Sequence, residues 1–309
     1  MYTYHERERA RQEVDIPQEL FHQAVQYSLD YISKHYRYPA DPRQVLDYHG
    51  PAHTTEVVSR TQRILETIRQ QDPALISQRD IQRGVLGAVF HDIVQQWESV
   101  PSLQDEVMVI MRKGKPGFNE KASRYMALQY MHEVNDQYGR EIFSDEDCDI
   151  VGKGILLTIP GYDMHLKTVI QPGLTADTGL VEGALALADL GGAGMDGPDA
   201  YATEGNRLFL ELNMDVRAIL FEGRTMSSLQ KDLFRKRLLA WGTGQIDFAA
   251  GRVARLEREL AFIPEHIRPA IVALFAKGEE TVAKSKELYS KRLDMSTNEL
   301  REELEKVMS

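Results

Sequence analysis

Residues 85–92 read VLGAVFHD, an apolar run that ends in a histidine and an aspartate. The run continues a helical pattern that begins after Ser77, with Asp80 placed three residues later as in a capping box. A His-Asp pair alone is weak evidence, because a chain with nine histidines can contain one by chance. Its meaning depends on which polar residues elsewhere in the chain can meet it.

Outward from this run, the chain is expected to be helical almost throughout, which predicts an all-α fold. Apolar residues recur at helical spacing in most segments, and sustained period-two alternation is not evident. Gly and Pro interrupt residues 98–118, which are expected to form a long loop with one short helical piece from Asp105 to Met111. Helices are expected at residues 17–36, 52–70, 78–92, 119–134, 144–161, 180–190, 200–220, 228–240 and 246–262, with Asn119 and Ser144 as N-caps.

Three parts are expected along the chain. Residues 1–16 are charged and predicted to be a flexible N-terminus, and residues 17–263 form the main helical domain. The composition changes at Pro264, and residues 264–309 are predicted to be a C-terminal helical extension rich in Lys and Glu. This extension could cap the domain or pack against a partner helix, so a homodimer stays open.

Composition limits the classes of partner. The 309 residues carry a net charge of −10, which argues against a nucleic-acid polymer as ligand but leaves room for a local phosphate pocket. No apolar stretch has the length of a membrane span, and the N-terminus lacks the apolar core of a secretory signal. A single cysteine, Cys148, fits a cytoplasmic location, and its acidic surroundings disfavour a catalytic thiolate.

Two further stretches supply groups that could join the His-Asp pair. Residues 48–53 read YHGPAH and end in His53, and residues 184–191 read ALALADLG and contain Asp189. A carboxylate inside so apolar a segment is costly unless it is paired or binds a metal ion. His53, His91, Asp92 and Asp189 could therefore hold one divalent ion, although His53 alone could equally be an ordinary buried histidine. Imidazole and carboxylate donors suit Mn, Fe, Co, Ni, Zn or Mg.

These motifs, with NEKAS at residues 119–123 and FRKRLL at residues 234–239, make the chain resemble the HD superfamily of metal-dependent phosphohydrolases. Within it the chain is most similar to a bacterial branch with a Tyr-His-Asn-x-x-His opening, and the similarity extends over residues 18 to 260. The resemblance implies an HD-domain helical bundle, here with additional C-terminal helices.

Carried over by position, the resemblance implies that His53, His91, Asp92 and Asp189 bind the metal ion. One ion is expected, and a second is the alternative. His49 takes the place of a histidine that protonates the leaving oxygen in related cyclic-nucleotide phosphodiesterases. A histidine suits such a role, but His49 could also be a turn residue bonded to the backbone.

Glu120 would then lie near the metal ion as a base or a group that positions water. A first-turn glutamate that complements the helix dipole explains it as well. Lys121 and Arg124 are candidates to bind the substrate phosphate, with a solvated helix face as the ordinary alternative.

The chain departs from the family pattern at several positions. Gly50 replaces an asparagine, and Gln95 stands where nucleotidase relatives have a catalytic glutamate. The histidine that usually follows the family's Ile-x-x-Thr element is missing after Thr158, and His165 is the nearest substitute. These changes affect the substrate and the base rather than the metal ligands.

The expected function is metal-dependent hydrolysis of a phosphate ester or anhydride in a small nucleotide-like molecule. An HD scaffold kept as a ligand-binding or regulatory module, with weak catalysis, is an alternative that the departures favour. A di-iron oxygenase is a third, for which Glu120 and His165 would have to bind a second metal ion.

Overall fold

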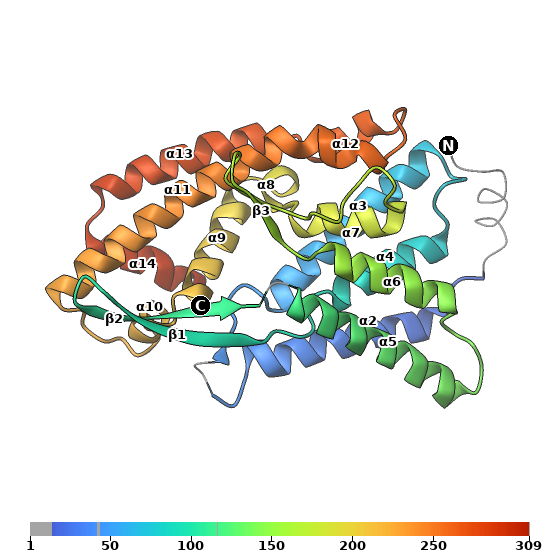
Figure 1. Ribbon diagram of the computed structural model, residues 1–309, viewed down its shortest axis with the longest axis horizontal. Coiled ribbons are helices and arrows are strands. Elements are labelled where there is room, and N and C mark those ends of the chain that lie inside the picture. Colours follow the sequence, from blue (N-terminus) through green and yellow to red (C-terminus); the bar gives the residue numbers. More distant parts are fainter. Residues whose placement is uncertain (1–13, 42–43, 116, 309) are drawn as a thin grey trace.

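Helices form almost all of the regular structure in the computed structural model, which describes residues 14–41, 44–115 and 117–308 (Figure 1). The all-α prediction is therefore confirmed, with two small two-stranded sheets added to it. Most of the flexible N-terminus expected at residues 1–16 lies outside the described residues. Ile16 is buried, and its backbone N donates to Oε1 of Gln82 at 2.9 Å.

The first half of the chain forms a layered bundle. Its core lies among α2, α4, α5 and α6, and a second core lies among α3, α4, α7 and α12. The elements are α2 (Gln18–Ile32), the π-helix η1 (Ser33–Arg37), α3 (Pro51–Gln71), α4 (Gln78–Phe90), α5 (Phe118–Tyr138), α6 (Asp145–Leu157) and α7 (Leu180–Asp189). Helix α4 thus packs in both cores, which explains why all ten of its residues from Ile81 to Phe90 are buried.

Close helix packing around α4 depends on two glycines. A Cβ atom at Gly84 would lie 2.4 Å from Leu65 of α3, and one at Gly87 would lie 3.0 Å from Leu185 of α7. Larger side chains there would separate the helices. The two glycines therefore let the end of α4 approach both α3 and α7.

Two helices begin where the sequence predicts. The predicted capping boxes form at Ser77 with Asp80 and at Ser144 with Asp147. The prediction of Asn119 as an N-cap is wrong, since Gly117 precedes the helix and Asn119 lies in its first turn. Helix α6 ends at Leu157 rather than near residue 161, and the short strands β3 (Gly161–Asp163) and β4 (Thr168–Ile170) follow it.

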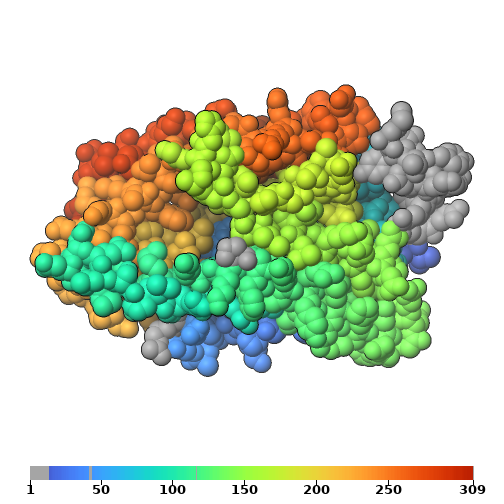
Figure 2. Space-filling view, viewed as in Figure 1, coloured from blue at the N-terminus to red at the C-terminus, as the bar shows by residue number. Residues whose placement is uncertain are grey.

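The expected loop at residues 98–118 is instead mainly a β-hairpin of β1 (Trp97–Gln104) and β2 (Val107–Gly114). The predicted helical piece from Asp105 to Met111 is wrong. Asp105 and Glu106 both have positive φ, which is the geometry of a tight hairpin turn. Val107 and Val109 are buried, whereas Met108 and Ile110 are exposed. The hairpin lies at the surface of the molecule (Figure 2).

The second half of the chain forms a further group of helices. These are α8 (Gly192–Met195), α9 (Pro198–Leu212), α10 (Met214–Phe221), α11 (Ser228–Glu259), the 3-10 helix η3 (Leu260–Phe262), α12 (Arg268–Leu274), α13 (Gly278–Asp294) and α14 (Thr297–Met308). The helix expected at 200–220 is divided at Asn213. The two helices expected at 228–240 and 246–262 are one, α11, in which Gly242 allows Tyr289 of α13 to approach.

The C-terminal helices pack against their own chain. Helix α13 lies along α11, and α14 contacts both α9 and α11 (Figure 1). Ile267 and Ile271 share a core with α3 and α7, across the predicted boundary at residue 264. Over the described residues, no helix is both long enough and apolar enough to cross a membrane.

Candidate metal centre

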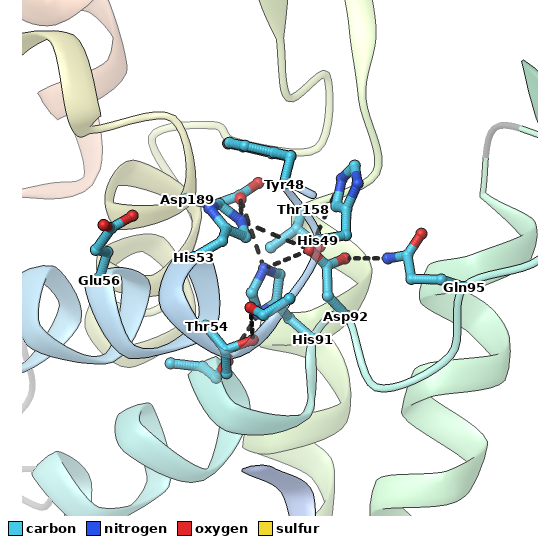
Figure 3. A network of polar contacts seen from close by, with 12 residues as sticks. Tyr48, His49, His53, Thr54, Glu56, His91, Asp92, Gln95, Thr158 and Asp189 are labelled. Atoms are coloured by element: carbon cyan, nitrogen blue, oxygen red, sulfur yellow. Dashed lines mark hydrogen bonds and ion pairs between the residues drawn. The ribbon is translucent and has the colours of Figure 1, made fainter. Parts of the chain in front are cut away.

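Three helix ends bring the four predicted ligands together (Figure 3). His53 lies in the first turn of α3, where Pro51 at the first helical position fixes the start of the helix. His91 and Asp92 directly follow α4, and Asp189 is the last residue of α7. Because α3, α4 and α7 pack against one another, the side chains converge at one end of this group.

The histidine nitrogens face the carboxylate oxygens at short range. Nε2 of His53 lies 3.6 Å from Oδ2 of Asp92 and 3.5 Å from Oδ1 of Asp189. Nε2 of His91 lies 3.1 Å and 3.6 Å from the same two oxygens. The structure thus places all four predicted ligands in one cluster, which we call the His/Asp cluster.

The surroundings of His91 fit a metal ligand. Its Nδ1 lies 2.7 Å from the carbonyl oxygen of Ala88, so the ring donates there and directs Nε2 at the cluster. Burial lowers the pKa of His91, but the carboxylates of Asp92 and Asp189 outweigh it and raise that pKa well above its usual value. Nε2 is buried and forms no hydrogen bond of acceptable geometry. A buried nitrogen in this state is costly unless another partner, such as a metal ion, is bound.

Each carboxylate of the cluster is oriented by an amide. Nε2 of Gln95 donates to Oδ1 of Asp92 at 2.8 Å, and Nε2 of Gln171 donates to Oδ2 of Asp189 at 3.0 Å. Gln95 in turn accepts a hydrogen bond from Asn119 at 3.1 Å. Each aspartate therefore keeps its other oxygen for the cluster, and Gln95 has a supporting role that the sequence did not reveal.

The cluster lowers the pKa values of its two aspartates. Burial by itself raises the pKa of Asp92, but the nearby His91 and His49 lower it to about 2. The pKa of Asp189 is likewise held below its usual range, against the effect of burial, by the nearby imidazoles of His53 and His91. Both carboxylates are therefore ionised at neutral pH and available as oxygen ligands.

His49 lies beside the cluster and is held by Glu211 of α9. Nδ1 of His49 lies 2.5 Å from Oε1 of Glu211, and Oε2 accepts hydrogen bonds from the backbone N of Tyr48 and of His49. Nε2 of His49 points back to Oδ2 of Asp92 at 4.0 Å. Burial lowers the pKa of His49, but the carboxylates of Glu211 and Asp92 outweigh it and raise the pKa to about 9.

Sequence reasoning missed Glu211, although a signal was present. It stands in the apolar run Phe209-Leu210-Glu211-Leu212 and is fully buried. This is the pattern that singled out Asp189, a carboxylate in an apolar helix. The alternative that His49 is a backbone-bonded turn residue does not describe its side chain, which pairs with Glu211.

Aromatic rings lie beside His49 and His53. The ring of Tyr48 lies 4.4 Å from that of His53, and the ring of Trp97 lies 5.5 Å from that of His49, measured between centroids. His53 and His91 are 2% and 1% exposed, whereas the side chains of Asp92 and His49 are 14% and 18% exposed. Asp189 is 15% exposed, so the cluster faces solvent on the side of its two carboxylates and His49.

The other predicted residues lie on α5. Glu120 is half-buried with one buried oxygen that forms no hydrogen bond, and burial with the charges of Asp92 and Asp189 raises its pKa. Lys121 and Arg124 are exposed, and the Arg124 side chain lies against Gly152 of α6. The charges of the cluster therefore act on the Glu120 carboxyl. The phosphate-binding role of Lys121 and Arg124 stays a prediction.

The structure also describes His165, the alternative metal ligand, and Cys148, the only cysteine of the sequence. His165 is exposed in the turn between β3 and β4, and its backbone N donates to Asp163. Cys148 is buried, and burial with its acidic neighbours raises the pKa of the thiol to about 11, which disfavours a thiolate.

A second group of potential ligands consists of His53, Glu56 and Glu204, with one ligand atom of each within 4.8 Å of the others. The buried guanidinium of Arg60 lies 3.8 Å from Glu56 and pairs directly with Glu204. Because this cation already balances the carboxylates, the group is a poor site for a second metal ion.

His53, His91 and Asp92 form a group that could hold a metal ion, and Asp189 adds a carboxylate oxygen 3.5 Å from Nε2 of His53. Amides orient the carboxylates from behind, and a paired histidine stands at the accessible side. Comparisons of the chain with protein-family models, with curated proteins and with solved structures found no match.

Proposed function

We propose that the protein is a metal-dependent phosphohydrolase of the HD type, acting on a phosphate ester or anhydride of a small molecule. The single observation that supports this best is the convergence of His53, His91, Asp92 and Asp189 around an unsatisfied Nε2 of His91. A divalent ion bound there would supply a Lewis acid for phosphoryl oxygens and lower the pKa of a water molecule. The motif order that resembles HD phosphohydrolases points to the same chemistry.

The protein's own groups would move protons. His49 would donate its Nε2 proton to the leaving oxygen, since Glu211 fixes the Nδ1–H of the ring and stabilises the charged imidazolium. Glu120 would position the attacking water by accepting a hydrogen bond with its unpaired oxygen. Gln95 has no ionisable group and already supports Asp92, so it does not take the role of a base.

The test is a phosphatase screen of phosphomonoesters and nucleotides on protein purified with Mn²⁺ or Co²⁺. The double variant His91→Ala plus Asp92→Ala is expected to lose bound metal and activity together. His266→Ala, an exposed histidine 4.0 Å from Asp72, is the matched control and should behave as wild type. Equal activity of the double variant and the wild type would refute the proposal.

A ligand-binding module with little catalysis is a second candidate, favoured by Gln95 at the position of a catalytic glutamate in nucleotidase relatives. It requires about one bound metal ion per chain with no turnover of any phosphate compound tested. About two irons per chain would instead favour the oxygenase alternative.

A further inference from the structure

A cavity of about 260 Å³ opens directly beside the His/Asp cluster. Tyr48 and Asp189 form its inner end, while α9, α11 and the β3–β4 segment form its walls. Figure 2 shows the surface hollowed next to the β3–β4 segment. The lining residues that carry the argument are Tyr48, Asp189, Tyr201, Leu208, Trp241 and Phe248.

The surface of the cavity walls is mainly apolar, and two of its aromatic side chains have their polar groups bonded within the protein. The Tyr201 hydroxyl donates to the carbonyl of Gln245 at 2.7 Å, and the Trp241 ring N–H donates to the carbonyl of Gly205 at 3.0 Å. Both polar ends are thus satisfied within the protein. The rings of Tyr201 and Phe248 are nearly parallel, at 10°. Such a surface is suited to an aromatic or apolar group.

The charges of the lining disfavour a second anionic group. Asp189 and Glu204 both line the cavity, and Asp247 lies at its rim. Lys167 is the one cation among the described lining residues, and its Nζ lies 3.8 Å from Asp247. Because Arg60 already pairs with Glu204 and Lys167 with Asp247, no described lining residue offers a free cation to a further phosphate or carboxylate of a substrate.

We infer that this cavity binds the uncharged, aromatic part of a substrate that carries its single phosphate group at the His/Asp cluster. The inference rests on the proposed function and narrows it, because polyphosphate compounds are then poor substrates. It also gives Tyr48 a position at the junction, with its ring beside His53 and against the cavity.

Gly244 of α11 allows the cavity to be obstructed with little strain. It lines the cavity, and a Cβ atom added there meets no atom within 4 Å. Gly244→Trp should narrow the entrance, and Gly244→Ala is the matched control. Val169→Trp on β4 obstructs the cavity from another wall, in case the first variant does not fold as judged by circular dichroism.

The kinetic test compares 2-phenylethyl phosphate with ethyl phosphate in the Mn²⁺-loaded enzyme, since both release a primary alcohol. The wild type and Gly244→Ala should prefer the phenyl compound in kcat/KM by about tenfold or more. Gly244→Trp should lose that preference, so that its kcat/KM values for the two esters become similar. Equal kcat/KM for the two esters in the wild type would overturn the inference.

A binding test separates this inference from the proposed function. Prodan, an uncharged naphthalene dye, should bind to the wild type and to Gly244→Ala, and its fluorescence should increase. Its affinity for Gly244→Trp and for Val169→Trp should be about tenfold lower. That result supports the cavity assignment even if no phosphate ester is hydrolysed, in which case only the phosphohydrolase proposal fails. Prodan binding that is equal in all variants would overturn the assignment of the cavity, whatever the enzyme hydrolyses.

Discussion

Glu211 and His49 form a partly buried pair across 162 residues of sequence, with Oε1 of Glu211 2.5 Å from Nδ1 of His49. The second oxygen, Oε2, accepts two backbone N–H groups from the segment that carries His49. One carboxylate therefore fixes both the backbone and the ring of this histidine, and leaves Nε2 directed at the His/Asp cluster. A histidine held in this way is prepared to donate a proton from a defined position.

Glu211→Gln should lower kcat by about 100-fold or more, because the ring loses the charge that stabilises its imidazolium. Bound metal should not change, since Glu211 is not among the ligands. His49→Gln should cause a similar loss, and the double variant should be no slower than either single one, because the two residues act as a unit. Multiplicative losses in the double variant would show that they act separately. Steady-state kinetics with metal analysis of the same samples measures both quantities.

Gln95→Ala should weaken metal binding by about 10- to 100-fold, because Asp92 loses the amide that orients its Oδ1. The neighbouring Gln96, whose side chain is exposed, provides the control Gln96→Ala. Titration of the metal-free protein with Mn²⁺, followed by calorimetry, gives the two dissociation constants. Unchanged affinity in Gln95→Ala would mean that Asp92 is held by other contacts or does not bind metal.

The sequence predicts those parts of the fold that depend on local chemistry. Ser77 and Asp80 form the expected capping box because both partners lie within four residues of each other. The hairpin escaped prediction because Val107 to Met111 are all apolar, which hides the alternation between buried and exposed faces. The sequence predicts a helix end near Gly242, but α11 continues through it. The glycine instead lets Tyr289 of α13 approach, and α13 lies far away in the sequence.

The candidate site also contains some residues that the sequence can predict and others that it cannot. Asp189 was conspicuous as a carboxylate in an apolar run, and the same criterion applied to Glu211 would have found it. Gln95 and Gln171 carry no such signal, because an amide is ordinary on any surface and gains its role only from packing. The cavity likewise combines Tyr48, Tyr201 and Trp241 from three distant segments.

Asp147 should make stability depend on acid pH. It is fully buried, and hydrogen bonds from Arg79 together with the charge of Arg83 outweigh burial and lower its pKa. A carboxyl whose folded-state pKa is depressed stabilises the fold above its unfolded-state pKa of about 3.9, and this stability is lost as pH falls through the folded-state value. The free energy of unfolding should therefore decline from about pH 5 downward.

Asp147→Asn should lower the free energy of unfolding at pH 7 by about 3–5 kcal/mol, because Arg79 and Arg83 both lose the buried carboxylate with which they form ion pairs. The difference from wild type should shrink as pH falls below about 4, where the carboxyl of the unfolded chain begins to protonate while the native one is still ionised. Asp149→Asn, in an exposed pair with Lys153, is the control and should change stability by less than about 1 kcal/mol. Urea unfolding at several pH values measures this, and a difference independent of pH would contradict the assignment.

The C-terminal helix α14 should stabilise the domain rather than serve only for association. Leu300 and Leu304 are fully buried against Phe209 and Phe234 of α9 and α11. Leu304→Ala should therefore lower the free energy of unfolding by about 2–5 kcal/mol, whereas Leu293→Ala, 47% exposed on α13, should have little effect. Because α9 also carries Glu211, removal of residues 265–309 should reduce activity together with stability. Urea unfolding and sedimentation distinguish the two roles of the extension. A truncated chain of unchanged stability that sediments only as a smaller species would show that the extension serves association instead.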